Sequence, residues 1–294
     1  MLGLLHQTLS GLATGGIYAS LALALVVVYR ATSHVNFAQG EMATFSTYIA
    51  LALVQAGVPY WLAFLATLAV SFAMGVALER LLMRRMADAP ALSAVGVSIG
   101  LLLIFNALGG WLFGYTVKPF PSPFESGEGG GGAVLGGLAS RHEIGMTAVT
   151  LAVLAIVAVF FRFTTLGLAM RAAAVNPQAS RLVGIRVGRT LALGWGMAAA
   201  LGAVAGMMVA PVVFLDPNMM SGILLYAFAG ALLGGIDNPA GAVVGGFAVG
   251  VIENLGGAYL VGTDLKLTLA LAIIAAVLVL RPAGLFGRAV ARRV

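Results

Sequence analysis

Long apolar segments dominate the chain, and they are continuous instead of alternating with polar positions. A hydrocarbon core about 30 Å thick needs roughly 20 apolar residues in a helix, and only helices and closed barrels satisfy their backbone groups in lipid. Continuous runs of this kind predict helices. The predicted spans are residues 8–29, 41–57, 60–79, 92–113, 146–162, 190–213, 222–235, 241–261 and 265–281.

The seventh segment, 222–235, is short enough to be a re-entrant or broken helix, so the pattern predicts eight or nine spans. Nothing in the pattern divides the chain. We therefore expect residues 1–294 to form one all-α domain, a polytopic transmembrane helix bundle. Glycines four apart within the spans place small residues on one helix face and predict close backbone packing. These pairs are Gly202 and Gly206, Gly230 and Gly234, Gly241 and Gly245, and Gly246 and Gly250.

Composition agrees with a lipid environment. Of the 294 residues, 61% are hydrophobic and 9% are charged, with a mean hydropathy of +1.05, whereas a soluble domain carries about 25% charged residues. The net charge of +6 comes from short basic clusters between apolar runs, which does not indicate a nucleic-acid surface. No basic residue precedes Arg30, so the first apolar run is expected to remain as an anchor and not to be a cleaved signal.

Basic residues in the connecting segments predict the orientation, because cytoplasmic loops carry more lysine and arginine. Alternating crossings place one group on a single side: Arg30, Arg80, Arg84, Arg85, Arg162, Arg171, Arg181, Arg186, Arg189, Arg281, Arg288, Arg292 and Arg293. The other side keeps Lys118, Arg141 and Lys266. The first side is therefore predicted to be cytoplasmic. The N-terminus would be periplasmic and the C-terminus cytoplasmic in a bacterial inner membrane, which requires nine crossings.

The segment 114–145 is the longest predicted external loop, and its prolines and the glycine run 129–132 are typical of extended, irregular chain. We assign it no function. The predicted cytoplasmic loop 163–189 is more informative. Asn176 is a good helix N-cap, Pro177 suits the first helical position, and Gly184 supplies a stop. A two-turn helix closed at both ends is therefore predicted, preceded by a second short helix over 166–174.

Two interpretations of this capped loop remain open from its local chemistry. It could receive force from a soluble partner on the cytoplasmic side, or it could be an interfacial helix whose Arg171 and Arg181 meet anionic lipid headgroups.

Polar residues inside the predicted spans are further candidates, because such residues are costly in lipid. Glu253 and Asn254 lie in the eighth predicted span, and Glu41 opens the second. Glu253 either lines a polar path or contacts a partner subunit, or it is a protonated or hydrogen-bonded packing residue. Asn36 is expected to cap the second helix, with Glu41 near its positive end, and this capping role suffices to explain the motif without a gate.

Several motifs, in order along the chain, resemble the permease family of branched-chain amino acid ABC importers, in its LivH-type form. The loop shows an arginine, an alanine-rich turn, Asn-Pro and a Leu-x-Gly-Ile ending, as that family's coupling loop does. The segment 35–41, VNFAQGE, resembles its most recognisable motif, with Gln39 where histidine is common. The segments 15–19, 216–220, 234–242, 253–254 and 281–287 also fit. The resemblance covers nearly the whole chain apart from the glycine-rich loop.

The resemblance implies a subunit that forms half of a translocation path for branched-chain or related amino acids. A second, LivM-type permease, two cytoplasmic ABC ATPases and a periplasmic binding protein would be its partners, and no nucleic acid is expected. The implied ATPase-coupling residues are Arg171, Asn176, Pro177, Arg181, Leu182 and Gly184. The candidate path or gate residues are Asn36, Gln39, Glu41, Glu253 and Asn254.

The sequence predicts no enzyme. It has no G-x-x-x-x-G-K-[ST] run, so any ATP would be hydrolysed by partner subunits and no cofactor is expected on this chain. Its three histidines lack metal-ligand spacing, and it has no cysteine. An ion-coupled secondary transporter remains the alternative. That transporter would need a relay of intramembrane carboxylates, for which Glu253 is the main candidate.

Overall fold

The computed structural model describes residues 2–32, 34–86, 89–124, 133–134 and 139–287, and most of these are helical. The long helices are α1 (Leu2–Thr32), α2 (Gln39–Gln55), α3 (Tyr60–Leu81), α4 (Ala91–Phe113), α5 (Arg141–Phe163), α8 (Val187–Val213), α9 (Met219–Gly234), α10 (Pro239–Gly256) and α11 (Lys266–Leu280). The short elements are η1 (Met83–Met86), α6 (Thr165–Val175), α7 (Pro177–Leu182), the π-helix η2 (Gly257–Val261) and η3 (Thr263–Leu265). The strands β1 (Ala133–Val134) and β2 (Ala139–Ser140) pair antiparallel. The all-α prediction is confirmed.

Each predicted span corresponds to a helix, but the helices differ in length. In the part of the chain that the structure describes, seven helical segments are long and apolar enough to cross a membrane. The other two, α2 and α9, have 17 and 16 residues. The predictions for the glycine run 129–132 and for Arg288, Arg292 and Arg293 lie outside the described residues.

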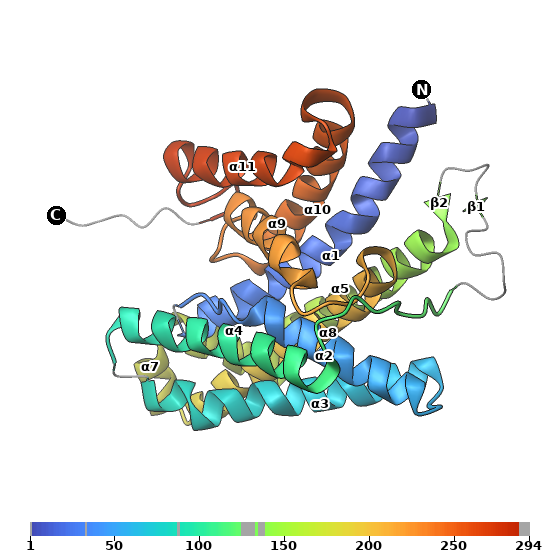
Figure 1. Ribbon diagram of the computed structural model, residues 1–294. Coiled ribbons are helices and arrows are strands. Elements are labelled where there is room, and N and C mark those ends of the chain that lie inside the picture. Colours follow the sequence, from blue (N-terminus) through green and yellow to red (C-terminus); the bar gives the residue numbers. More distant parts are fainter. Residues whose placement is uncertain (1, 33, 87–88, 125–132, 135–138, 288–294) are drawn as a thin grey trace.

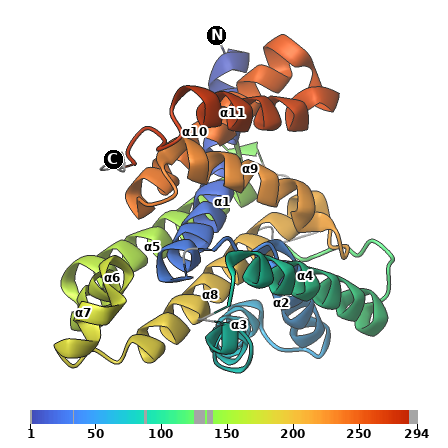
Figure 2. The same ribbon diagram turned by 90° about the vertical axis from the view of Figure 1, so that its left-hand side faces the viewer.

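Two long helices, α1 and α8, form the centre of the bundle. Both are largely buried, whereas α4, α5 and α11 keep most of their surface exposed. Helix α1 packs on α10, α8 and α9, and α8 packs on α3 and α2 (Figures 1 and 2). A helix that is apolar all round can be buried on every side, as α1 is. Leucines and isoleucines on α4 and α5 are exposed, which suits contact with lipid.

Glycine permits the closest of these packings, as the spacing of four predicts. A Cβ added at Gly250 of α10 would lie 2.3 Å from the Cα of Gly15 in α1, and one at Gly230 would lie 2.7 Å from the Cα of Gly246. One added at Gly206 of α8 would lie 2.3 Å from the hydroxyl oxygen of Thr47 in α2. The glycine spacing therefore does predict where helix backbones meet, on both α8 and α10.

These contacts predict that Gly250→Val destabilises the fold by at least about 2 kcal/mol, because the new side chain meets backbone atoms that cannot move aside. Gly96→Val on α4 is the matched control, since a Cβ there meets nothing within 4 Å. Thermal unfolding in detergent would measure both. Equal unfolding temperatures for the two variants would contradict the packing argument.

Candidate functional site

The loop between α5 and α8 forms a helical hairpin of α6 and α7, here called the α6–α7 hairpin (residues 165–184). The Asn176 side chain accepts a hydrogen bond from the backbone N–H of Ala179 at 2.9 Å, and Pro177 occupies the first turn of α7. Gly184 follows the helix with φ of 85°. The predicted N-cap, proline position and glycine stop are therefore all confirmed. The predicted preceding helix is α6, whose first turn is capped by Thr164.

The α6–α7 hairpin exposes apolar and basic side chains together. Leu182 is 89% exposed and Val183 is 77% exposed, beside the exposed Arg181. Arg171 on α6 is also exposed. Figure 2 shows α7 at the periphery of the bundle, near the N-terminal end of α8. Large exposed apolar groups rimmed by charge mark a contact surface, so the hairpin offers a surface for a partner protein or for lipid.

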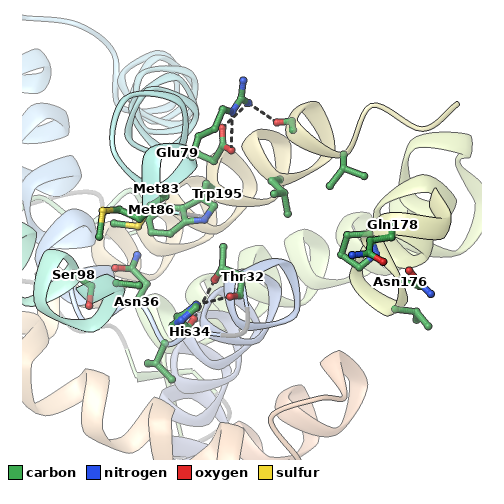
Figure 3. Close-up of a pocket in the computed structure, with 18 of the residues that line it drawn as sticks. Thr32, His34, Asn36, Glu79, Met83, Met86, Ser98, Asn176, Gln178 and Trp195 are labelled. Atoms are coloured by element: carbon green, nitrogen blue, oxygen red, sulfur yellow. Dashed lines mark hydrogen bonds and ion pairs between the residues drawn. The ribbon is translucent and has the colours of Figure 1, made fainter. Parts of the chain in front are cut away.

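A cavity of about 670 Å³ separates the α6–α7 hairpin from the ends of α1, α3 and α4. Its lining includes Asn176, Gln178 and Arg181 of the hairpin, with Asn36 and Trp195 across from them. Figure 3 shows Asn176 and Gln178 on one side of the space and Asn36 and Ser98 on the other, with His34 bonded to the backbone oxygen of Thr32. Of the residues singled out by sequence, Asn36, Asn176, Pro177 and Arg181 thus face a common cavity, whereas Gln39, Glu41, Arg171, Leu182 and Gly184 do not line it.

Asn36 and Gln39 hold the beginning of α2 against α8. The Gln39 amide nitrogen donates to the carbonyl of Ala198 at 2.8 Å, and the Asn36 amide nitrogen donates to the Gln39 side-chain oxygen at 3.2 Å. Both residues are buried. The prediction that Asn36 caps α2 is wrong: the N-cap is Ala38, without a side-chain bond. Helix α2 begins at Gln39, so Asn36 lies too far upstream and instead accepts from the Ala38 N–H.

Glu41 belongs to a second set of polar groups, the polar cluster, formed by Glu41, Asn106, Asn218 and Ser221. The Ser221 hydroxyl donates to one carboxylate oxygen of Glu41 at 3.3 Å, and the Asn106 amide nitrogen lies 3.4 Å from the other. That amide also bonds the Asn218 side-chain oxygen at 2.9 Å. The cluster joins α4 to the points where α2 and α9 begin.

Glu253 and Asn254 lie elsewhere, between α1, α10 and α11. One Glu253 oxygen forms an ion pair with Lys266 at 2.8 Å, and the other accepts from the Tyr18 hydroxyl at 3.3 Å. Asn254 donates to the hydroxyl of Thr14 at 3.0 Å. The structure therefore divides the five candidate path residues into three sets: Asn36 with Gln39, Glu41 in the polar cluster, and Glu253 with Asn254. Glu253 is paired with a cation of the same chain.

Sequence reasoning missed Lys266, Asn106, Asn218 and Ser221 as members of these groups. Lys266 was assigned to the external side, so its ion pair was not predicted. It nevertheless begins an apolar run, where a lysine needs an anionic partner. Asn106 carried the signal of a polar residue within the fourth predicted span, whereas Asn218 and Ser221 carried none beyond their polarity near the start of α9. An ion pair of the same kind, Glu79 with Arg84 at 2.9 Å, fastens the end of α3, and Arg84 also donates to the carbonyl of Gly188 at 2.6 Å.

Comparisons with known proteins cover almost the whole chain. Residues 7–280 match a family model described as "Branched-chain amino acid transport system / permease component". The high-affinity branched-chain amino acid permease protein LivH of Salmonella typhimurium is 30% identical, over 97% of this chain and 96% of that protein. BraD of Pseudomonas aeruginosa, a permease protein of the same description, is 31% identical over the same shares. A probable LivH of Methanocaldococcus jannaschii is 28% identical, over 91% and 87%.

A solved structure, PsaBC from Streptococcus pneumoniae in complex with Fab, resembles the fold with a TM-score of 0.51. It covers 93% of this chain and 91% of that chain at 12% identity, so the likeness concerns the fold alone.

The Glu253–Lys266 pair predicts a strong coupling between α10 and α11. Lys266→Met leaves a buried carboxylate without a cation and should lower the free energy of unfolding by roughly 3 kcal/mol. Adding Glu253→Gln to that variant should restore most of the loss. Thermal unfolding of the two single variants and the double variant in lipid nanodiscs would measure the coupling, with Lys118→Met as a control. Additive effects of the two substitutions would contradict it.

Proposed function

Because this chain belongs to the family of branched-chain amino acid transport permease components, we propose that it forms half of the membrane path of an ATP-driven ABC importer for branched-chain or related amino acids. The match of the family model over residues 7–280 carries this proposal. The exposed α6–α7 hairpin supports it, because a permease that hydrolyses no ATP needs a surface through which an ATPase can act.

The proposed partners follow from that role. A second, LivM-type permease would complete the path, two cytoplasmic ABC ATPases would dock on the coupling hairpins, and a periplasmic binding protein would deliver the amino acid. We propose that this chain itself carries no catalytic, cofactor or metal site. Arg171, Asn176, Pro177, Arg181, Leu182 and Gly184 would then serve the contact with an ATPase. Leu182 supplies exposed apolar area, and Arg181 supplies charge.

The proposed orientation places the α6–α7 hairpin and the C-terminus in the cytoplasm and the N-terminus in the periplasm. Arg84, Arg171, Arg181 and Arg186 would then lie on the cytoplasmic side, as the excess of basic residues in cytoplasmic loops requires.

The ion-coupled alternative receives less support. A secondary transporter would use an intramembrane carboxylate that gains and loses its ion during transport. Glu253, on which that alternative depended, has a basic partner at 2.8 Å within the same chain. The α6–α7 hairpin would also have no ATPase to contact in such a transporter.

The docking role predicts that Gly184→Pro abolishes ATP-driven uptake while the chain stays inserted. Gly57→Pro is a closely matched control at the opposite end of the bundle. Both glycines have φ between 85° and 87°, and both donate their N–H to the residue three positions earlier, at 3.1 and 3.0 Å. Proline removes that donor and cannot adopt a positive φ, so the local damage is equal.

Uptake of labelled leucine by proteoliposomes that contain the permeases, the ATPases and the binding protein would test this prediction. Gly184→Pro should stop uptake and reduce co-purification of the ATPases, whereas Gly57→Pro should retain both. Unimpaired uptake in Gly184→Pro would contradict the docking role. Uphill uptake by the purified chain alone, without any ATPase, would overturn the proposed function.

A further inference from the structure

We propose that Glu41, at the centre of the polar cluster, binds the α-ammonium group of the amino acid during its passage. This inference rests on the proposed function and assigns a substrate-contacting site within it. It starts from a difference among three buried carboxylates. Glu79 and Glu253 each have a basic partner, at 2.9 and 2.8 Å, whereas among the described residues no lysine or arginine forms an ion pair with Glu41.

Burial makes this difference significant. Glu41 is only 5% exposed, and a charged group taken out of water is costly unless it is paired. Its two hydrogen bonds come from neutral donors and are long, at 3.3 and 3.4 Å. A carboxylate accepts about four bonds and forms its strongest ones with cationic donors. Glu41 also lies in the first turn of α2, where the positive end of the helix offsets part of its charge. Because no basic side chain of the described residues pairs with it, it still has capacity for a cation.

A second carboxylate adds to the negative charge of this site. The Asp216 carboxylate accepts from the backbone N–H of Asn218 at 2.7 Å, and Asn218 bonds Asn106, which bonds Glu41. Asp216 is also near enough to Glu41 for the two charges to repel each other. The site is thus acidic on two sides, and a cationic group would relieve the repulsion.

An unpartnered hydroxyl lies on the same helix face as Glu41. Tyr48 lies seven residues after Glu41 and therefore on the same face of α2. Its ring stacks on Phe113 of α4 at 4.7 Å, and Asp216 lies near enough to act on it electrostatically. The residue is fully buried, and its hydroxyl has no hydrogen-bond partner among the described residues. A buried hydroxyl without a partner is costly, and a ligand with several donors would satisfy it.

The site is open to one face of the bundle. Asn218 and Ser221 are exposed, and a Cβ added at Gly222 meets nothing within 4 Å. Polar side chains are rarely exposed to lipid and usually face a water-filled path or another protein. This face, formed by α4 and the beginning of α9, is therefore the wall that would face the second permease. A solute between the two permeases could reach Glu41 past Ser221.

The ligand chemistry follows from the acceptors. An ammonium group offers three donors and one positive charge, which suits a carboxylate with a nearby hydroxyl. Every zwitterionic amino acid carries this group, so the site would tolerate different side chains. A path needs binding that is favourable enough for entry and weak enough for release. One carboxylate that is already partly bonded to Ser221 and Asn106 meets that requirement better than a closed ion cage.

The test uses the complete transporter in proteoliposomes, with labelled leucine delivered by the binding protein. Glu41→Gln should lower the initial uptake rate about tenfold, because a charge-assisted bond to the ammonium group becomes a neutral one. Co-purification of the subunits, the unfolding temperature and the ATPase rate should stay within about twofold of the wild type. Glu41→Asp should retain more uptake than Glu41→Gln, and Tyr48→Phe should lower it moderately.

The matched control is Glu143→Gln, which neutralises a carboxylate in the capping box at the start of α5. Glutamine serves equally well there, so uptake should not change. Wild-type uptake in Glu41→Gln would overturn the inference. Loss of subunit assembly in Glu41→Gln would also overturn it, because Glu41 would then pair with a basic residue of the second permease. An inactive wild-type complex would count against the proposed function instead.

Discussion

Within lipid, every backbone polar group must be satisfied inside the protein and an unpaired polar side chain is costly, and the architecture of this chain depends on that constraint. Glu79 and Glu253 satisfy it with Arg84 and Lys266. Gln39 satisfies it with the carbonyl of Ala198, which binds α2 to α8. These few polar contacts fix which helix faces meet, because apolar side chains alone have little preference between a neighbouring helix and lipid tails.

The same constraint explains why two short helices are acceptable. A helix that faces lipid must match the thickness of the hydrocarbon core, which takes about 20 residues. Helix α2 is buried over most of its length, so its 17 residues contact other helices instead of lipid. Glycines on α8 and α10 allow helix backbones to approach closely, which compensates for the small contact area that a short helix offers. Burial within the bundle therefore replaces length as the condition for stability.

Sequence reasoning succeeded wherever the determinant was local. Asn176, Pro177 and Gly184 specify α7 through bonds and dihedral angles within a few residues, so the hairpin could be predicted in detail. The Asn36 cap failed because α2 begins at Gln39 with Ala38 as its N-cap, which leaves Asn36 two residues before the capping position. The contact of Asn106 with Asn218 joins positions 112 residues apart. No local pattern encodes it, and only the packing of α4 against the beginning of α9 creates it.

The hairpin and the polar cluster are distant in sequence but are linked by one rigid helix. Helix α8 begins at Val187, directly after the α6–α7 hairpin, and its Ala198 carbonyl holds Gln39 at the start of α2. Glu41 lies two residues later. A displacement of the hairpin by an ATPase would therefore move α8 as a unit, and the beginning of α2 with it, which would change the separation of Glu41 from Ser221 on α9. The hydrogen bond between Ser221 and Glu41 is long, at 3.3 Å, so a small movement suffices to break it. In the proposed orientation, force at the cytoplasmic surface and release of a bound ammonium group would then be a single mechanical event.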